Sequence, residues 1–94
     1  MTVAIIAGKF PLGELRITPG ITCVMTRDEA FDALIRHMTG DWGDLDKHDW
    51  KQNDIALERG FRLFSRYVTP AGTPFWIITE HDRSVTTILL PEEN

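Results

Sequence analysis

The sequence predicts an α+β domain in which two or three helices pack on a C-terminal three-stranded antiparallel meander. Two helical segments with clear capping residues come first, and three short runs rich in β-branched and aromatic residues follow, separated by turn residues. The chain has 94 residues, of which 43% are hydrophobic. This length suits one domain with one core, covering residues 1–94.

The segment before the helices contains one strand candidate and one ambiguous stretch. Residues 14–17 have the pattern of a strand that ends before a turn. Residues 20–25 remain open between helix and strand, because Thr18 before Pro19 is typical of a helix start whereas β-branched residues follow. Cys23, the single cysteine, excludes an intrachain disulfide and fits a reducing, cytoplasmic setting. We expect it to be a small buried hydrophobe.

The first long helix is the clearest element of the sequence. Thr26 begins a capping box, and the apolar residues after it recur at helical spacing, which predicts a helix over residues 27–39. Gly40 stands where a left-handed residue would end that helix. His37 in the last turn is expected to interact with the terminal carbonyls, and Asp41 to bond amides of the turn.

A second helix is predicted from the next N-cap. Asp46 has the position of that cap, and the helix runs to about residue 59, before a glycine. Asn53 shares a helix face with Trp50 and Leu57, so it points toward the interior. A buried amide there must find hydrogen-bond partners.

Three strands are predicted at residues 61–69, 75–80 and 85–90, joined by two short connections. If the first connection has four residues, Thr69 faces Pro74. One face of the sheet then holds a core, made of Phe64, Val68, Phe75, Ile77, Ile88 and Leu90. The other face is too apolar for a solvated surface, and it is made of Leu63, Ser65, Tyr67, Trp76, Ile78, Thr87 and Leu89.

The second face needs a cover, because exposed apolar patches of this kind usually mark contact sites. The N-terminal apolar patch at residues 3–7 is one candidate, and a second subunit or a protein partner is the other. Tyr67 opposite Trp76 would form a cross-strand aromatic pair, which is the leading contact candidate. Trp42 is a further aromatic candidate for a contact.

Polar side chains gather in the last hairpin without a catalytic pattern. No metal-binding histidine pair, nucleophile elbow or phosphate-binding glycine loop appears, so no catalytic residue, metal or cofactor is predicted. Glu80 and Asp82 are expected to be solvated or bonded to Arg83. If the end of the first helix packs beside this hairpin, His37 and Asp41 would join them in one polar site.

The charge balance limits the choice of partners. The formal net charge is -4, with ten basic residues scattered along the chain, whereas a nucleic-acid binder needs a clustered excess of Lys and Arg. The N-terminus lacks a basic region, and its apolar stretch is far shorter than a membrane span requires. We therefore expect no nucleic-acid or membrane partner.

Two strings in the chain are unusual enough to indicate a family. They are HMTGDWG at residues 37–43 and WIITEHDRSVTTILLP at residues 76–91. With them the chain, over about residues 10–93, resembles a family of small bacterial proteins of unknown function whose members often lie on plasmids and other mobile elements. Some members carry labels naming a type I restriction system. The resemblance implies no activity.

Together these observations predict a non-enzymatic protein-interaction module that binds a protein partner or forms a homodimer. The sheet that is apolar on both faces, the acidic charge balance and the context of the family it resembles together favour an accessory or inhibitor protein from a mobile element that acts on a host defence complex. The alternative is a small-molecule binder or hydrolase with a polar site formed by the first helix end and the last hairpin.

Overall fold

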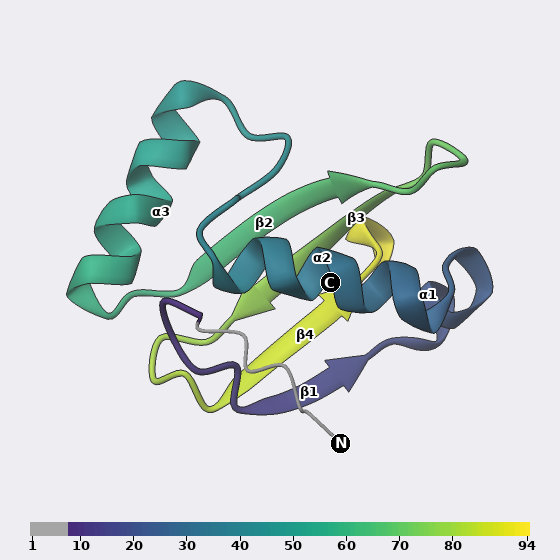
Figure 1. Cartoon of the computed structure of the whole chain (residues 1–94), viewed down its shortest axis with the longest axis horizontal. Helices are drawn as coiled ribbons and strands as arrows, with labels where there is room; N and C mark the ends of the chain where they lie inside the picture. The colour runs from purple at the N-terminus through teal and green to yellow at the C-terminus, as the bar shows by residue number, and fades with distance from the viewer. Residues whose placement is uncertain (1–7) are drawn as a thin grey trace, which may run out of the picture.

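Four strands and three helices form two layers in the computed structural model, which describes residues 8–94 (Figure 1). The α+β class is therefore confirmed. No helix in this part of the chain is long and apolar enough to cross a membrane. In chain order the elements are β1 (Glu14–Ile17), α1 (Pro19–Val24), α2 (Arg27–Met38), α3 (Lys47–Arg59), β2 (Leu63–Val68), β3 (Pro74–Thr79), β4 (Val85–Leu89) and the 3-10 turn η1 (Pro91–Glu93).

The sheet has one strand more than the sequence predicts. Its order is β1-β4-β3-β2, in which β2, β3 and β4 form the expected antiparallel meander and β1 pairs with β4 in parallel. A parallel neighbouring strand is reached through a crossover connection. In this chain the segment that connects β1 to the meander contains all three helices. A four-residue strand pattern gives no information on which distant strand it will join.

The first hairpin differs from its predicted register by one residue. Val68 pairs with Pro74, and the Thr69 amide donates to the Thr73 carbonyl, so Thr69 belongs to the connection rather than facing Pro74. Such a slip turns every side chain of β2 to the opposite face. The second hairpin has the predicted register, with the Glu80 amide bonded to the Val85 carbonyl.

The two sheet faces therefore exchange the side chains of β2. The helix face, which α1 and α2 cover, holds Leu63, Ser65, Tyr67, Phe75, Ile77, Thr79, Thr86 and Ile88. The open face holds Phe64, Arg66, Val68, Trp76, Ile78, Thr87 and Leu89. Tyr67 does not face Trp76, and the predicted cross-strand pair between them is wrong.

The caps of the two longer helices form as predicted. Thr26 and Glu29 make a reciprocal capping box at the start of α2, and Asp46 accepts a hydrogen bond from the Asp49 amide at the start of α3. Gly60 ends α3 in a left-handed conformation, with φ of 77°. These local bonds satisfy amides that the first helical turn leaves unpaired.

The ambiguous stretch after β1 is helical. Pro19 stands in the first turn of α1, and this short helix buries Ile21 completely against α2 and the sheet. Cys23 is exposed, so its predicted burial is wrong. A six-residue helix turns only one side to the core, and Ile21 takes that side.

On the open face, no helix among α1, α2 and α3 covers the sheet. The C-terminal turn η1 lies beside Ile78 and Leu89, and it is tied to the start of α1 because Glu93 accepts bonds from the Thr18 hydroxyl and the Gly20 amide. The N-terminal patch at residues 3–7, which was one candidate cover, lies outside the described residues.

Candidate functional site

His37 lies at the centre of a buried chain of hydrogen bonds that crosses the sheet. Its Nδ1 is 2.6 Å from the Ser65 hydroxyl and its Nε2 is 2.9 Å from Thr79 Oγ1. Thr79 Oγ1 is 2.8 Å from Thr86 Oγ1, which donates to the Leu12 carbonyl at 2.7 Å. The chain thus links α2 to β2, β3, β4 and the segment before β1.

The last bond fixes the direction of all the others. A threonine hydroxyl has one proton, and Thr86 uses its proton on the Leu12 carbonyl, so the proton between the two threonines belongs to Thr79. Thr79 must then accept from His37 Nε2–H. In a neutral ring with its proton on Nε2, Nδ1 is an acceptor, so the Ser65 hydroxyl donates to it.

Burial keeps this imidazole neutral. His37 has no exposed surface, and the loss of solvent, with the positive charge of Arg83 as a smaller cause, lowers its pKa to about 3. Phe10 and Trp42 close its other sides at ring distances of 5.3 and 5.6 Å. A histidine that is sealed in this way holds elements together and does not meet a substrate.

The other predicted residues near the end of α2 also have structural partners. The pKa of Asp41 is lowered, first by its hydrogen bond from Arg36 at 2.8 Å and also by the Gly43 amide. Trp42 is fully buried and donates to Asp54, so it is a core residue rather than a contact residue. Tyr67 is buried as well, and its hydroxyl donates to the Asp41 carbonyl at 2.6 Å.

Arg83 is bound to backbone carbonyls from three parts of the chain. Its guanidinium donates to the carbonyls of Phe61, Glu80 and Ala56, which ties the end of α3 to the last hairpin. Asp82 bonds the amide and hydroxyl of Ser84, and these bonds lower its pKa. The polar side chains of Asp82, Arg83 and Ser84 therefore stabilise the last hairpin.

The predicted polar pocket does not form. Glu80 pairs with Arg62 at 3.5 Å on the surface, while His37 is enclosed and Asp41 is held by Arg36. Together with Arg83, these side chains do not line one cavity. This geometry gives the hydrolase alternative no support.

The open face of the sheet presents a different kind of surface. Phe64 and Trp76 are half-buried and meet edge to face with ring centres 5.0 Å apart, and Val68 beside them is 48% exposed. Three arginines lie on the same face: Arg16 is bound to Glu14, Arg62 to Glu80, and no carboxylate among residues 8–94 forms an ion pair with Arg66. The face combines an aromatic pair with charged residues of both signs.

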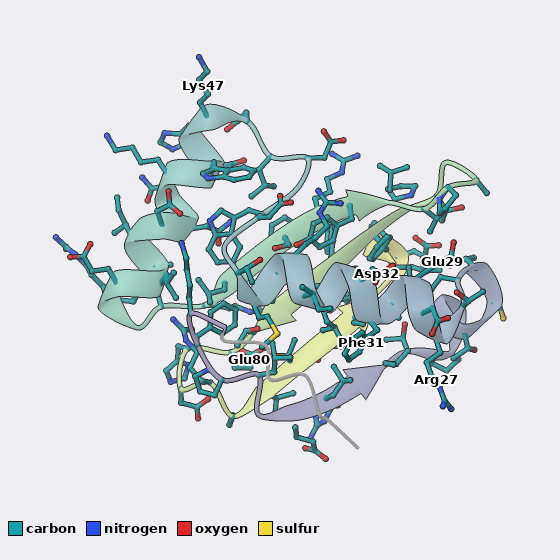
Figure 2. The ribbon with its side chains drawn as sticks, in the orientation of Figure 1. Arg27, Glu29, Phe31, Asp32, Lys47 and Glu80 are labelled. Carbon is teal, nitrogen blue, oxygen red and sulfur yellow. The ribbon has the colours of Figure 1, made fainter. Side chains whose placement is uncertain are left out.

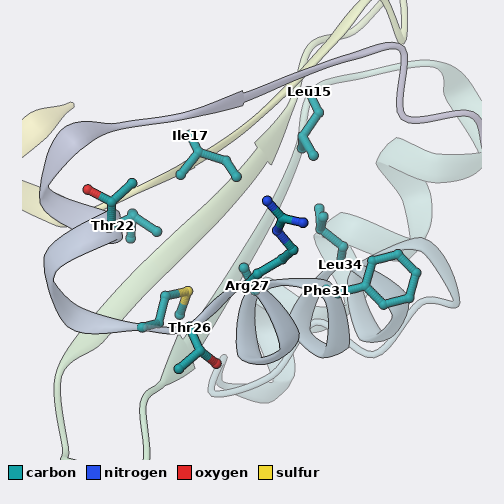
Figure 3. Close-up of a pocket in the computed structure, with 10 residues that line it drawn as sticks. Leu15, Ile17, Thr22, Thr26, Arg27, Phe31 and Leu34 are labelled. Carbon is teal, nitrogen blue, oxygen red and sulfur yellow. The ribbon is translucent and has the colours of Figure 1, made fainter.

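A second surface is the groove between β1 and α2, with a volume of about 360 Å³. Leu15 and Ile17 line it from β1, and Leu34 and the exposed Phe31 line the α2 side (Figure 3). Figure 2 shows Phe31 on α2 in the whole molecule. Arg27 also lines the groove and extends from α2 toward β1 (Figure 3). The surface is mainly apolar.

Of the three aromatic residues predicted for a contact, Tyr67, Trp42 and Trp76, only Trp76 has its ring at the open face. The predicted register places Phe64 and Val68 in the core, and the one-residue difference turns both to the open face. The sequence of β2 contains a signal that predicts their true position. Arg62, Phe64, Arg66 and Val68 are spaced two apart and so share one face of the strand. Arginines rarely point into a core, so this face is expected to be the outer one.

Comparisons with protein-family models, curated proteins and solved structures find no match for this chain. The candidate surfaces therefore rest on the geometry of the molecule alone.

Proposed function

We propose that this chain is a non-enzymatic protein-interaction module that binds its partner through the open face of the sheet. The observation that carries the proposal is the Phe64–Trp76 pair on a sheet face that α1, α2 and α3 leave uncovered. Aromatic side chains surrounded by a polar rim are the usual composition of a binding hot spot.

Arg66 is the feature of this face that favours a different protein over a second copy. Arg16 and Arg62 are paired with Glu14 and Glu80, and Glu93 of η1 adds a third carboxylate beside Ile78 and Leu89, whereas no carboxylate among residues 8–94 forms an ion pair with Arg66. A dimer that brought two Arg66 side chains together would cost free energy. A partner with a carboxylate opposite Arg66 would pair with the guanidinium charge and would cover the rings of Phe64 and Trp76.

The family resemblance supplies the biological setting of this proposal. In that setting the chain is an accessory or inhibitor protein of a mobile element, and its partner belongs to a host defence complex. We propose that the partner is a cytoplasmic protein and that the chain acts on it by binding, without catalysing a reaction.

The experiment compares the open face with an equally exposed apolar position elsewhere. The partner is captured from the native host, purified, and titrated against wild type, Val68→Asp and Phe61→Asp. Val68 is 48% exposed on the open face and Phe61 is 56% exposed outside it, so the same charge is introduced at both. We expect Val68→Asp to raise the Kd at least about tenfold and Phe61→Asp to leave it nearly unchanged.

Arg66→Glu tests the charge assignment in the same titration. It should slow association more than Arg59→Glu does, because Arg59 lies on α3, away from the face. Equal affinities for wild type and Val68→Asp would refute the proposal. If the wild-type chain forms a concentration-dependent dimer that Val68→Asp abolishes, the open face mediates self-association and the proposal of a different partner is wrong.

A further inference from the structure

We propose that β1 pairs with β1 of a second copy of this chain, so that two four-stranded sheets join into one continuous sheet. The two strands run antiparallel, with Leu15 of one copy opposite Leu15 of the other. Both copies use the same strand, which makes the contact a two-fold symmetric dimer interface. It lies at the edge of the sheet and does not depend on a partner at Phe64 and Trp76.

The edge of β1 has the backbone groups that a further strand needs. The amides of Glu14 and Thr18 donate toward β4, to the carbonyls of Ser84 and Ile88. Backbone groups alternate in direction along a strand, so those of Leu15 and Ile17 point away from β4. No strand among residues 8–94 pairs with that edge, and all four residues of β1 are exposed.

The opposite edge of the sheet is closed. The segment before α3 runs along β2, where the Arg66 amide donates to the Trp42 carbonyl and the Asp44 amide donates to the Arg66 carbonyl. Proteins usually protect their sheet edges, because a free edge invites pairing with another chain. Within residues 8–94, β1 is the edge strand that has no such cover.

The charges of β1 are complementary to those of a second copy. Glu14 and Arg16 are two residues apart and share the open face of the strand. When Leu15 lies opposite Leu15 in an antiparallel pair, Glu14 of each copy lies opposite Arg16 of the other. Opposite charges directly across two strands stabilise the pairing, and like charges destabilise it. A strand with charges of one sign would repel its own copy, whereas this strand attracts it.

The backbone geometry selects the same register. Leu15 opposite Leu15 is a hydrogen-bonded pair, because the backbone groups of both residues point to the shared edge. A register centred on Arg16 would bring two guanidinium groups together, and the backbone groups of Arg16 point to β4. A register centred on Ile17 would place Pro19, the first residue of α1, opposite Leu15, and proline has no amide to donate. Charge and hydrogen bonding therefore agree on one register.

The apolar side chains beside β1 also favour this partner. Leu15 and Ile17 are each 45% exposed and Phe31 is 55% exposed, and all three line the groove between β1 and α2 (Figure 3). The two-fold axis through the Leu15 pair is perpendicular to the sheet, so α2 of both copies lies on the same face of the joined sheet. The two grooves then meet, and apolar surface is removed from water.

Charge reversals at the two positions test the pairing by sedimentation. Glu14→Arg places arginine opposite arginine at both symmetric contacts, and Arg16→Glu places glutamate opposite glutamate. We expect each single reversal to raise the dimer Kd at least about tenfold. The double variant, Glu14→Arg with Arg16→Glu, restores opposite charges at both contacts. Its Kd should return to within about threefold of the wild-type value.

A mixture of the two single variants checks the same pairing in another way. One chain then has arginine at both positions and the other has glutamate at both, so every cross-strand contact joins opposite charges. We expect heterodimers at concentrations where either variant alone is a monomer. A mixture that associates no better than its components, or a double variant as weak as the single ones, would refute the pairing of Glu14 with Arg16.

Amide hydrogen exchange at several protein concentrations tests the register. The amides of Leu15 and Ile17 are the probes, and those of Glu14 and Thr18, which are bonded to β4, are the internal references. We expect the probes to exchange at least about tenfold more slowly at about 1 mM than at about 10 µM, and the references to be unaffected. Probe protection that does not change on dilution would show that the edge is covered within one chain, and the proposal would be wrong.

Leu15→Asp and Val68→Asp compare the edge of β1 with the open face. The two side chains are 45% and 48% exposed, so both variants should fold, which urea unfolding checks. Leu15→Asp brings two carboxylates together at the two-fold axis and should abolish the dimer, whereas Val68→Asp should retain it. The reverse result would assign the dimer to the open face and overturn this proposal. A wild-type chain that is still monomeric at about 1 mM would overturn it as well.

Discussion

His37 Nε2 donates to Thr79 Oγ1 at 2.9 Å and joins the last turn of α2 to a central strand of the sheet. The contact is sealed between Phe10 and Trp42, and the bonds beyond it continue to the Leu12 carbonyl. Every polar atom of this chain of bonds has a partner, which is the condition under which a buried polar network stabilises a fold. Its disruption should therefore be costly.

Stability should fall as the pH is lowered through the range in which free histidine titrates. The pKa of His37 is lowered by burial from 6.5 to about 3, so between these values the unfolded chain binds a proton that the folded chain does not. The free energy of unfolding then decreases with decreasing pH, by up to about 1.4 kcal/mol for each pH unit. Urea unfolding at pH 7.5, 6 and 5 measures this slope.

The exposed His48 provides the control for that slope. His37→Gln should remove most of the pH dependence between pH 7 and 5, and His48→Gln should retain it. Carboxylates with lowered pKa, such as Asp41, contribute at lower pH and do not account for a change in this window. A wild-type stability that is flat from pH 7 to 5 would contradict the neutral buried imidazole.

Removing the Thr79 hydroxyl should destabilise the fold by about 1–3 kcal/mol, because His37 Nε2–H then lacks an acceptor in a buried site. Valine has nearly the same shape, so the packing of Thr79→Val stays close to that of wild type. Thr87→Val on the open face is the matched control, and we expect it to change stability by less than about 0.5 kcal/mol. Denaturation in urea compares the two, and equal losses would refute the directional chain of bonds.

Much of the local structure follows from the sequence. The capping box at Thr26, the N-cap at Asp46 and the interior position of Asn53 are all found, and Asn53 bonds both the amide and the carbonyl of Phe64. These features depend on residues close in sequence or on helical periodicity. Such information is present in a single chain.

The errors arise where a long-range or one-residue choice decides the outcome. The partner of β1 depends on the path of the whole chain, and the side of β2 depends on whether Thr69 lies in the strand or in the turn. In the structure the Thr69 hydroxyl accepts from the Thr73 amide, so it belongs to the turn. Because the predicted strand includes Thr69, the predicted register of β2 is shifted by one residue. That shift places Tyr67 on the wrong face and separates Phe64 from Trp76.

The candidate polar site failed for a related reason. The sequence shows which polar residues are present, but not that Ser65 and Thr79 would enclose His37 or that Arg83 would find carbonyls of Phe61 and Ala56. Polar residues that come together in the fold can satisfy one another. Of the predicted aromatic contact residues, Trp76 is the one that stays half-exposed, at the open face.

Replacing Arg83 by methionine should lower stability by about 1.5–3 kcal/mol, because three carbonyls lose a charged donor at once. The effect should be greatest where α3 meets the last hairpin. Arg62→Met serves as the comparison: Arg62 makes an exposed ion pair with Glu80, which is worth at most about 1 kcal/mol. Thermal and urea unfolding of both variants give the ranking, and a smaller loss for Arg83→Met than for Arg62→Met would contradict the tie between α3 and the hairpin.

Alanine at Gly43 should be far more harmful than alanine at Gly72, although both glycines have positive φ, of 77° and 93°. A Cβ at Gly43 would lie 2.1 Å from the Arg66 carbonyl oxygen and 2.5 Å from the Tyr67 ring, whereas Gly72 faces open space. Gly72→Ala therefore measures the backbone strain alone, about 1–2 kcal/mol. Gly43→Ala adds a clash with the edge of β2 that only a backbone shift relieves, and we expect a loss at least about 2 kcal/mol greater. Urea unfolding of the two variants measures the difference, and similar losses would show that the segment beside β2 yields easily and does not close that edge of the sheet.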